Sequence, residues 1–231
     1  MRGDFLKKEI NMSHTLMVGY LLAFAGGFLD VYTYICRDGV FANAQTGNMV
    51  LLGVSVAKGN FLSAINYSIP VFAFVFGVIV SYFIKSKFLE NDFLQWKQIV
   101  LGVEIASLIA VAFVPEGKIS NMIVNIIISF VCSLQVQSFR RIKGNILATT
   151  MCTGNLRSGA EALCRYGENR DKADLKSGLV YLSVILSFIV GAAVGAVITN
   201  IFMCISALVP CFVLIIVFVM LFIKKKRKWM S

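Results

Sequence analysis

Two acidic residues stand inside long apolar stretches of this chain, where ionisable side chains are rare. Asp30 lies in the first stretch and Glu104 in a later one. A carboxyl group is costly to keep in apolar surroundings, and there it often binds ions or relays protons. Asp30 and Glu104 are therefore our candidates for ion coupling. The alternative is a structural acid, either protonated or bonded to backbone N–H groups.

The tripeptide Thr-Gly-Asn occurs twice, and each copy interrupts an apolar stretch. Glycine permits unusual backbone conformations, and threonine and asparagine cap helix starts. The N-terminus of such a half-helix presents free N–H groups, which suit a polar or anionic solute. We expect a substrate site formed by both tripeptides, Asp30 and its counterpart in the second half of the chain: Asp30, Thr46, Gly47, Asn48, Gln135, Thr153, Gly154 and Asn155. The alternative is two tight turns in a packed interface.

Arg157 directly follows the second tripeptide, and Glu161 lies four residues later. One hypothesis is that Arg157 contacts a solute carboxylate or pairs with Asp30. The other is an ion pair within an ordinary amphipathic helix, because residues four apart face the same side of a helix.

Other chemistry finds little support in the sequence. His14 is the only histidine, and none of the six cysteines is in a CxxC spacing. Neither a metal site nor a histidine-based catalytic triad is expected, and the chain contains no enzyme motif. We expect no catalytic residue, no metal and no cofactor.

The composition is that of a protein embedded in lipid. Apolar residues make up 58% of the 231 residues and charged residues only 15%, whereas a soluble domain has about 25% charged residues. The net charge of +10 fits cytoplasmic loops that contact anionic lipid headgroups, so no nucleic-acid partner is expected. We expect an all-α membrane protein.

Stretches long enough to span a bilayer are expected at 14–36, 61–85, 97–115, 119–139, 177–198 and 202–223. Two shorter stretches, 39–57 and 145–164, contain the tripeptides. If both are re-entrant hairpins and both termini are inside, 18 Lys and Arg residues lie inside, with Arg157 set aside. Three lie in outer loops: Arg37, Lys58 and Lys118. If both cross fully, the distribution falls to 14 against seven. The positive-inside rule favours six transmembrane helices plus two re-entrant half-helix hairpins, with both termini cytoplasmic.

The two halves of the chain resemble each other at an offset of about 105 residues. The first repeat covers 14–115 and the second 119–223, flanked by a cytoplasmic N-terminus (1–13) and a basic cytoplasmic tail (224–231). Each repeat has an odd number of crossings, so the second starts from the opposite side of the membrane. The halves are expected to form an inverted-topology repeat, and both tripeptides then approach the bilayer midplane.

Two segments also carry a family resemblance. Gly26-Gly27-Phe28-Leu29-Asp30, followed by Thr46-Gly47-Asn48-Met49-Val50, resembles the signature of the YoaK family of bacterial membrane proteins. Leu134-Gln135 and Thr153-Gly154-Asn155 resemble the corresponding motifs of its second half. The resemblance implies about six membrane helices and a multi-pass protein of the bacterial plasma membrane; the family is a domain of unknown function.

The leading hypothesis is a small-solute transporter with a midplane site between inverted repeats, coupled to proton uptake at Asp30. Its partners would be the lipid bilayer and a small polar or anionic solute. The alternatives are a passive channel and a non-transporting membrane scaffold, and a homo-oligomer stays open. Inverted repeats with interrupted segments are typical of transporters.

Overall fold

The structure is a computed structural model that describes residues 16–87, 93–139, 141–142, 145–146 and 152–229. The expected N-terminal segment 1–13 lies outside these residues, as do residues 147–151 just before the second tripeptide. The elements in chain order are α1 (Leu16–Cys36), α2 (Gln45–Ala57), α3 (Phe61–Lys87), α4 (Phe93–Ala112), α5 (Lys118–Ser138), β1 (Arg141–Ile142), β2 (Asn145–Ile146), α6 (Cys152–Asn169), α7 (Lys172–Phe202), the 3-10 helix η3 (Met203–Ala207) and α8 (Leu208–Trp229).

The long apolar helices confirm a multi-pass membrane protein. Among the described residues, four stretches are long and apolar enough to cross a bilayer: Leu16–Cys36, Phe61–Lys85, Lys118–Ser138 and Lys172–Leu221. The last is 50 residues long and contains α7, η3 and α8. Apart from the antiparallel pairing of β1 with β2, the described chain is helical, as expected.

The helix in the stretch expected at 145–164 has one buried side and one exposed polar side. Its helix, α6, buries Asn155, Gly159 and Ala162 and exposes Arg157 and Glu161 on the other side. This one-sided pattern describes an amphipathic helix that packs along a neighbour. That neighbour is α7, which starts at Lys172, five residues before the expected span.

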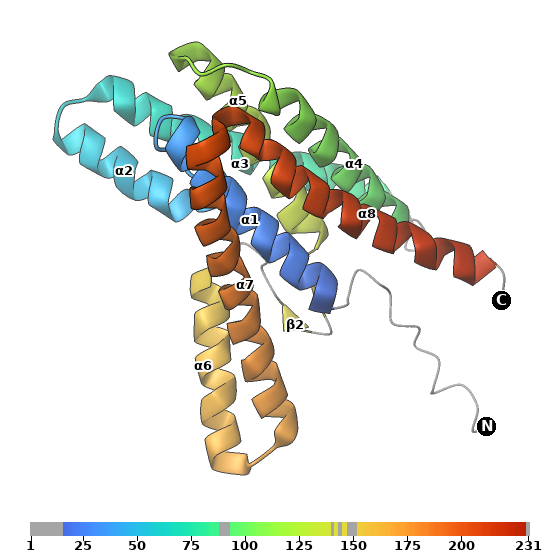
Figure 1. The fold of residues 1–231 in the computed structure, drawn as a ribbon. Coiled ribbons are helices and arrows are strands. Elements are labelled where there is room, and N and C mark those ends of the chain that lie inside the picture. Colours follow the sequence, from blue (N-terminus) through green and yellow to red (C-terminus); the bar gives the residue numbers. More distant parts are fainter. Residues whose placement is uncertain (1–15, 88–92, 140, 143–144, 147–151, 230–231) are drawn as a thin grey trace.

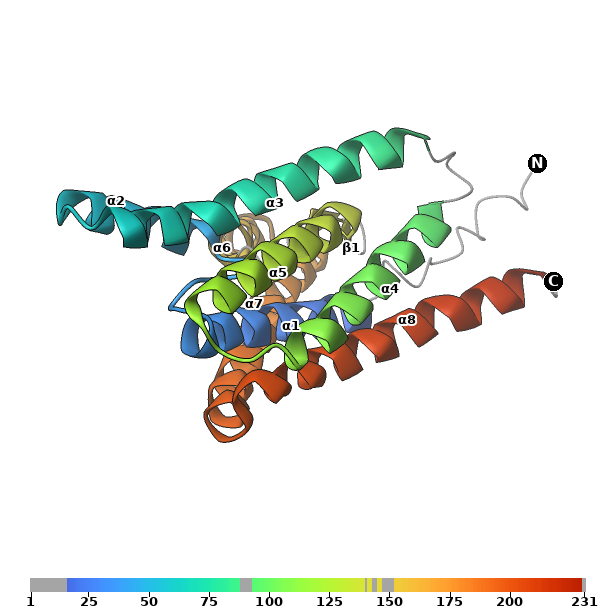
Figure 2. The ribbon, with the colours of Figure 1, turned by 90° about the horizontal axis from the view of Figure 1, so that it is seen from above.

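Helix α1 lies at the centre of the arrangement. It packs on α7 and α8, while α5 packs on α3 and α4, and α4 also contacts α8. In α1 67% of the apolar window is buried, against 17% in α3, so α3 presents most of its apolar surface to lipid. Figures 1 and 2 show two protruding hairpins, one formed by α2 with the start of α3 and the other by α6 with the start of α7.

The contact between α1 and α7 depends on glycines. A Cβ on Gly27 would collide with the Phe188 carbonyl oxygen, and a Cβ on Gly191 with the Phe24 carbonyl oxygen. Small residues spaced four apart let helix backbones approach closely in lipid. A Gly-x-x-x-Gly pattern predicts close helix packing, either within one chain or between two copies. In this structure Gly191 and Gly195 serve packing within the chain.

Replacing Gly191 by alanine is expected to destabilise the protein by about 1–3 kcal/mol, because the new methyl group meets backbone atoms that cannot move aside. Gly102→Ala is the matched control, since a Cβ there meets nothing within 4 Å. Thermal unfolding of the detergent-solubilised protein measures both. Equal midpoints for the two variants would contradict the tight contact of α1 with α7.

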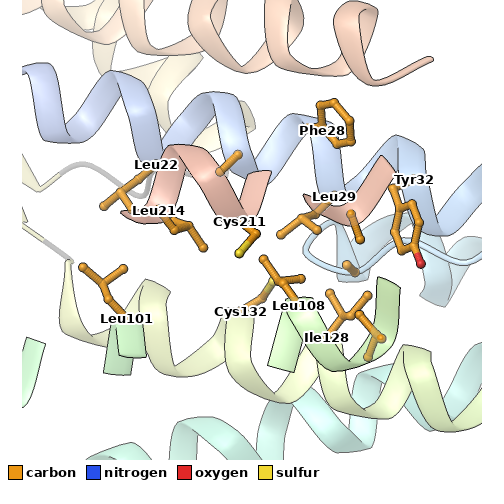
Figure 3. Close-up of a cluster of buried hydrophobic side chains, with 14 of the residues drawn as sticks. Leu22, Phe28, Leu29, Tyr32, Leu101, Leu108, Ile128, Cys132, Cys211 and Leu214 are labelled. Carbon is orange, nitrogen blue, oxygen red and sulfur yellow. The ribbon is translucent and has the colours of Figure 1, made fainter. Parts of the chain in front are cut away.

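The interior between α1, α4, α5 and α8 is an apolar cluster (Figure 3). Leucines from α1, α4 and α8 meet there with side chains of α5: Leu22, Leu29, Leu101, Leu108, Ile128, Cys132, Cys211 and Leu214. All of them are at most 3% exposed. The polar residues described next lie beside this cluster and depend on it to exclude water.

Candidate functional site

The first tripeptide begins a helix after the chain has turned back along α1. Asp38 and Gly39 both have positive φ values, 63° and 70°, and they turn the chain at the end of α1. The returning segment is held by hydrogen bonds from the Asn43 and Ala44 backbone N–H groups to the Asp30 carboxylate, with N···Oδ1 distances of 2.7 and 3.1 Å. Asp30 lies about 9 Å before the end of α1 at 1.5 Å per residue. The start of α2 therefore lies beside α1 at the level of Asp30, before the C-terminal end of α1.

Within this tripeptide, the three residues have different surroundings. Asn48 is buried and joins both backbone groups of Phe41: its Oδ1 accepts from the Phe41 N–H at 2.9 Å, and its Nδ2 donates to the Phe41 carbonyl at 2.7 Å. Gly47 leaves room for the Phe41 ring, which a Cβ would approach to 2.8 Å. Asn48 and Gly47 thus shape the loop, and Thr46 is exposed.

The second tripeptide lies in the first turn of α6. Asn155 is 3% exposed, whereas Thr153 and Gly154 are exposed. Cys152, the first residue of α6, interacts electrostatically with Asp30. The helices that carry the two tripeptides therefore both start near Asp30.

The second buried acid has an unexpected partner. The Gln135 amide of α5 donates to both carboxyl oxygens of Glu104 in α4, at 3.0 Å each. Glu104 is 0% exposed and Gln135 is 2% exposed. Sequence reasoning grouped Gln135 with Asp30 and did not predict this pairing. The available signal was that each side chain is a polar exception in an apolar helix, so each needs a polar partner.

Cys132 of α5 lies near both acids and near the Asn43 side chain. Figure 3 shows Cys132 within the apolar cluster. We call the buried polar groups around it the acid cluster, made of Asp30, Asn43, Glu104, Cys132 and Gln135.

Sequence reasoning also missed the role of Arg37, which was assigned to an outer loop. Its side chain is completely buried at the end of α1. The guanidinium donates to the Tyr32 hydroxyl at 2.8 Å, to the Val114 carbonyl at 2.9 Å and to the Asn121 side chain at 3.1 Å. It also donates to the Val111 carbonyl at 3.2 Å. Arg37 therefore caps the C-terminal end of α4, where carbonyl groups carry negative partial charge.

Arg157 takes the simpler of its two predicted roles. It forms an ion pair with Glu161 at 2.8 Å, and the two side chains are 81% and 51% exposed. The bond to Glu161 raises the pKa of Arg157 above its usual value. No ion pair between Arg157 and Asp30 exists in the part of the chain that the structure describes.

A groove with a volume of 410 Å³ lies away from the acid cluster, between the N-terminal parts of α3 and α5. Its polar lining comes from Asp38, Ser63, Asn66, Tyr67 and Lys118. None of the residues predicted for the substrate site lines it. The acid cluster shares Cys132 with the apolar cluster of Figure 3.

Comparisons with known proteins agree with this architecture. Residues 18–220 match the family model described as "Protein of unknown function (DUF1275)". The chain is 27% identical over 143 residues to the protein named "UPF0700 transmembrane protein YoaK" of Bacillus subtilis (strain 168). This match covers 60% of the chain and 62% of the relative, so it spans less than two thirds of that protein. No solved structure matches the chain.

Proposed function

This chain is an integral membrane protein of the DUF1275 family, and we propose that it carries a small solute across the bilayer. The observation that carries the proposal is the acid cluster: it contains two buried carboxyl groups, and one of them, Asp30, lies near the starts of the two helices that carry the tripeptides. In transporters built from repeats, binding sites lie near the bilayer midplane at such helix breaks. The proposed carrier rocks between its two halves around this cluster.

The packing of the helices supports an inverted repeat. When α1–α4 are matched with α5–α8, the main contacts between α-helices have exchanged counterparts. The pair α1 with α7 corresponds to α5 with α3, and α2 with α3 corresponds to α6 with α7. Likewise, α4 with α5 corresponds to α8 with α1. This exchange is what a two-fold relation between the halves produces, and we infer six crossings by α1, α3, α4, α5, α7 and α8.

The first interrupted segment also has the geometry of a re-entrant hairpin. Its chain returns along α1 to Asp30 before α2 begins, and α2 is only 13 residues long. A helix of 13 residues is about 20 Å long, which is too short to cross the hydrocarbon layer. Irregular backbone at membrane depth needs protein partners or water, and here Asp30, Thr33 and Asn48 are its partners.

Two other functions, a passive channel and a non-transporting scaffold, are the alternatives to a carrier. A passive channel needs a continuous water path, and the packed apolar cluster of Figure 3 favours an alternating carrier over such a path. A non-transporting scaffold has no use for buried acids, because apolar side chains of similar volume stabilise a protein equally or better. The acid cluster therefore favours transport over both.

Uptake into proteoliposomes tests the proposal. We expect the protein to accelerate saturable uptake of at least one radiolabelled solute from a panel of small acids, amino acids and amines. Asp30→Asn is expected to reduce this uptake at least tenfold, because the amide cannot carry the charge or the proton of the carboxyl group. Asp174→Asn, the same change at a surface acid paired with Arg165, is the control and should leave uptake unchanged.

Two outcomes would contradict the carrier. Uptake that rises linearly with concentration, without saturation, would indicate a channel. Uptake equal to that of protein-free liposomes for the whole panel would leave the scaffold as the function.

A further inference from the structure

Two buried oxygen atoms of the acid cluster have no hydrogen-bond partner in the described part of the chain. They are Oδ2 of Asp30 and Oδ1 of Asn43. The two residues are in direct contact, because the Asn43 N–H donates to the other oxygen of Asp30 at 2.7 Å. Buried polar atoms are nearly always satisfied. Two open acceptors on a pair of contacting buried residues indicate that a donating or positively charged group belongs beside this pair.

Among the described residues, no basic side chain forms an ion pair with either acid. The ion pairs there join Arg157 to Glu161 and Arg165 to Asp174. The buried guanidinium of Arg37 is directed at Tyr32, Asn121 and carbonyl oxygens at the end of α4. The buried ammonium of Lys97 lies 5.1 Å from the centre of the Phe139 ring.

Backbone N–H groups directly before α2 are already bonded to a carboxylate of the protein itself. Helix starts favour anions because their N–H groups are free to donate. Here the N–H groups of Asn43 and of Ala44, the residue before α2, donate to the Asp30 carboxylate. The carboxylate of the protein stands where a solute carboxylate would bind, and its second oxygen remains open.

We propose that the acid cluster binds a monovalent cation, at Asp30 Oδ2 and Asn43 Oδ1, and exchanges it for a proton. This inference rests on the transport function proposed above and names its substrate class. In the empty site the Asp30 carboxyl group holds a proton and is neutral. When a cation with one positive charge binds, that proton leaves to water on the side from which the cation came. The positive charge of the cation replaces that of the proton, and the O–H bond of the Asp30 carboxyl group is the covalent bond that breaks.

The surroundings of both acids are compatible with this exchange. The titratable groups that face Asp30 are the thiols of Cys132 from α5 and Cys152 from α6. Those facing Glu104 are the thiols of Cys132 and of Cys211 from α8. Thiols are neutral near pH 7 in apolar surroundings.

The test uses proteoliposomes with an acidic interior and an enclosed pH-sensitive dye. Chloride salts of sodium, potassium, choline and guanidinium are added outside in separate runs, so inorganic and organic cations are distinguished. We expect at least one of them to make the interior more alkaline in a saturable manner. Asp30→Asn should reduce the initial rate at least tenfold, and Glu104→Gln should reduce it less. Asp174→Asn should match the unmodified protein.

The variants are chosen so that a loss of folding can be distinguished from a loss of cation–proton exchange. Asparagine at position 30 retains an oxygen that accepts from the Asn43 and Ala44 N–H groups. A single gel-filtration peak in detergent at the position of the unmodified protein checks that the variant is folded. If Asp30→Asn exchanges cations at the unmodified rate, the inference is wrong.

Other outcomes separate this inference from the proposed function. Saturable uptake of a neutral or anionic solute, with no cation-driven proton movement, would overturn the cation site and leave transport standing. Cation uptake without proton movement would overturn the exchange step. The absence of flux for every cation and for the whole solute panel would overturn both proposals.

Discussion

Replacing Arg37 by methionine is expected to lower the free energy of unfolding by about 3–5 kcal/mol. The substitution removes the donor from five acceptors: Tyr32, Val111, Val114, Pro115 and Asn121. Each buried acceptor left without a donor costs about 1–3 kcal/mol, and rearrangement near the end of α4 recovers part of the sum. The methionine side chain retains apolar volume, so the effect reports the lost hydrogen bonds.

Denaturant unfolding of the detergent-solubilised protein measures this effect, with Arg165→Met as the control. Arg165 also bonds a carboxylate, that of Asp174, but its side chain is 51% exposed. An exposed ion pair contributes about 0–1 kcal/mol. If the two methionine variants unfold at the same denaturant concentration, Arg37 does not hold the end of α1 to the junction of α4 and α5.

Replacing Asp30 by leucine is expected to release the segment before α2 and to destabilise the protein by about 2–4 kcal/mol. Leucine branches at Cγ as aspartate does, but its methyl groups accept no hydrogen bond, so the two buried N–H groups of Asn43 and Ala44 are left without an acceptor. Hydrogen exchange followed by mass spectrometry should show faster exchange in peptides that contain these two residues.

Asp30→Asn is the matched control for this effect. Its side-chain oxygen still accepts from both N–H groups, so we expect less than half of the loss in stability and near-normal protection. Unchanged exchange in the leucine variant would show that the returning segment is held by other contacts. Together the two variants separate the structural role of Asp30, which asparagine preserves, from its charge, which asparagine removes.

These two predictions concern opposite kinds of buried charge. Arg37 is satisfied completely by neutral groups of the protein and joins α1 to the end of α4. Asp30 is satisfied on one oxygen only. A fully bonded charge holds a structure together, whereas a half-bonded one is available for exchange. This difference is why we assign a structural role to Arg37 and a transport role to Asp30.

The spacing of residues close together in the sequence was sufficient to predict several structural features. The apolar stretches predicted the helices at 14–36 and 61–85 within two residues at each end. The spacing of four between Arg157 and Glu161 predicted their ion pair, and the Gly191-x-x-x-Gly195 pattern predicted close helix packing. These features depend on residues within one or two helical turns, so the sequence alone contains the information.

Other features involve residues far apart in the chain. Gln135 meets Glu104 across 31 positions, and Arg37 meets Val114 across 77. The sequence marked Asp30 and Glu104 as exceptional and grouped Gln135 with Asp30 in one site, but it did not predict the hydrogen bonds from Gln135 to Glu104. It also placed Arg37 in an outer loop, because an arginine that directly follows an apolar stretch is usually an interfacial charge.

The amino-acid sequence by itself determined that this chain folds in a bilayer, which of its segments are helical and which acids are buried, because hydrophobicity and helical period are local properties. Only the tertiary structure decided which groups neutralise those acids and which oxygens remain open. That choice depends on how each helix is rotated and how deeply it lies against its neighbours, and rotation and depth are set by packing contacts between distant parts of the chain.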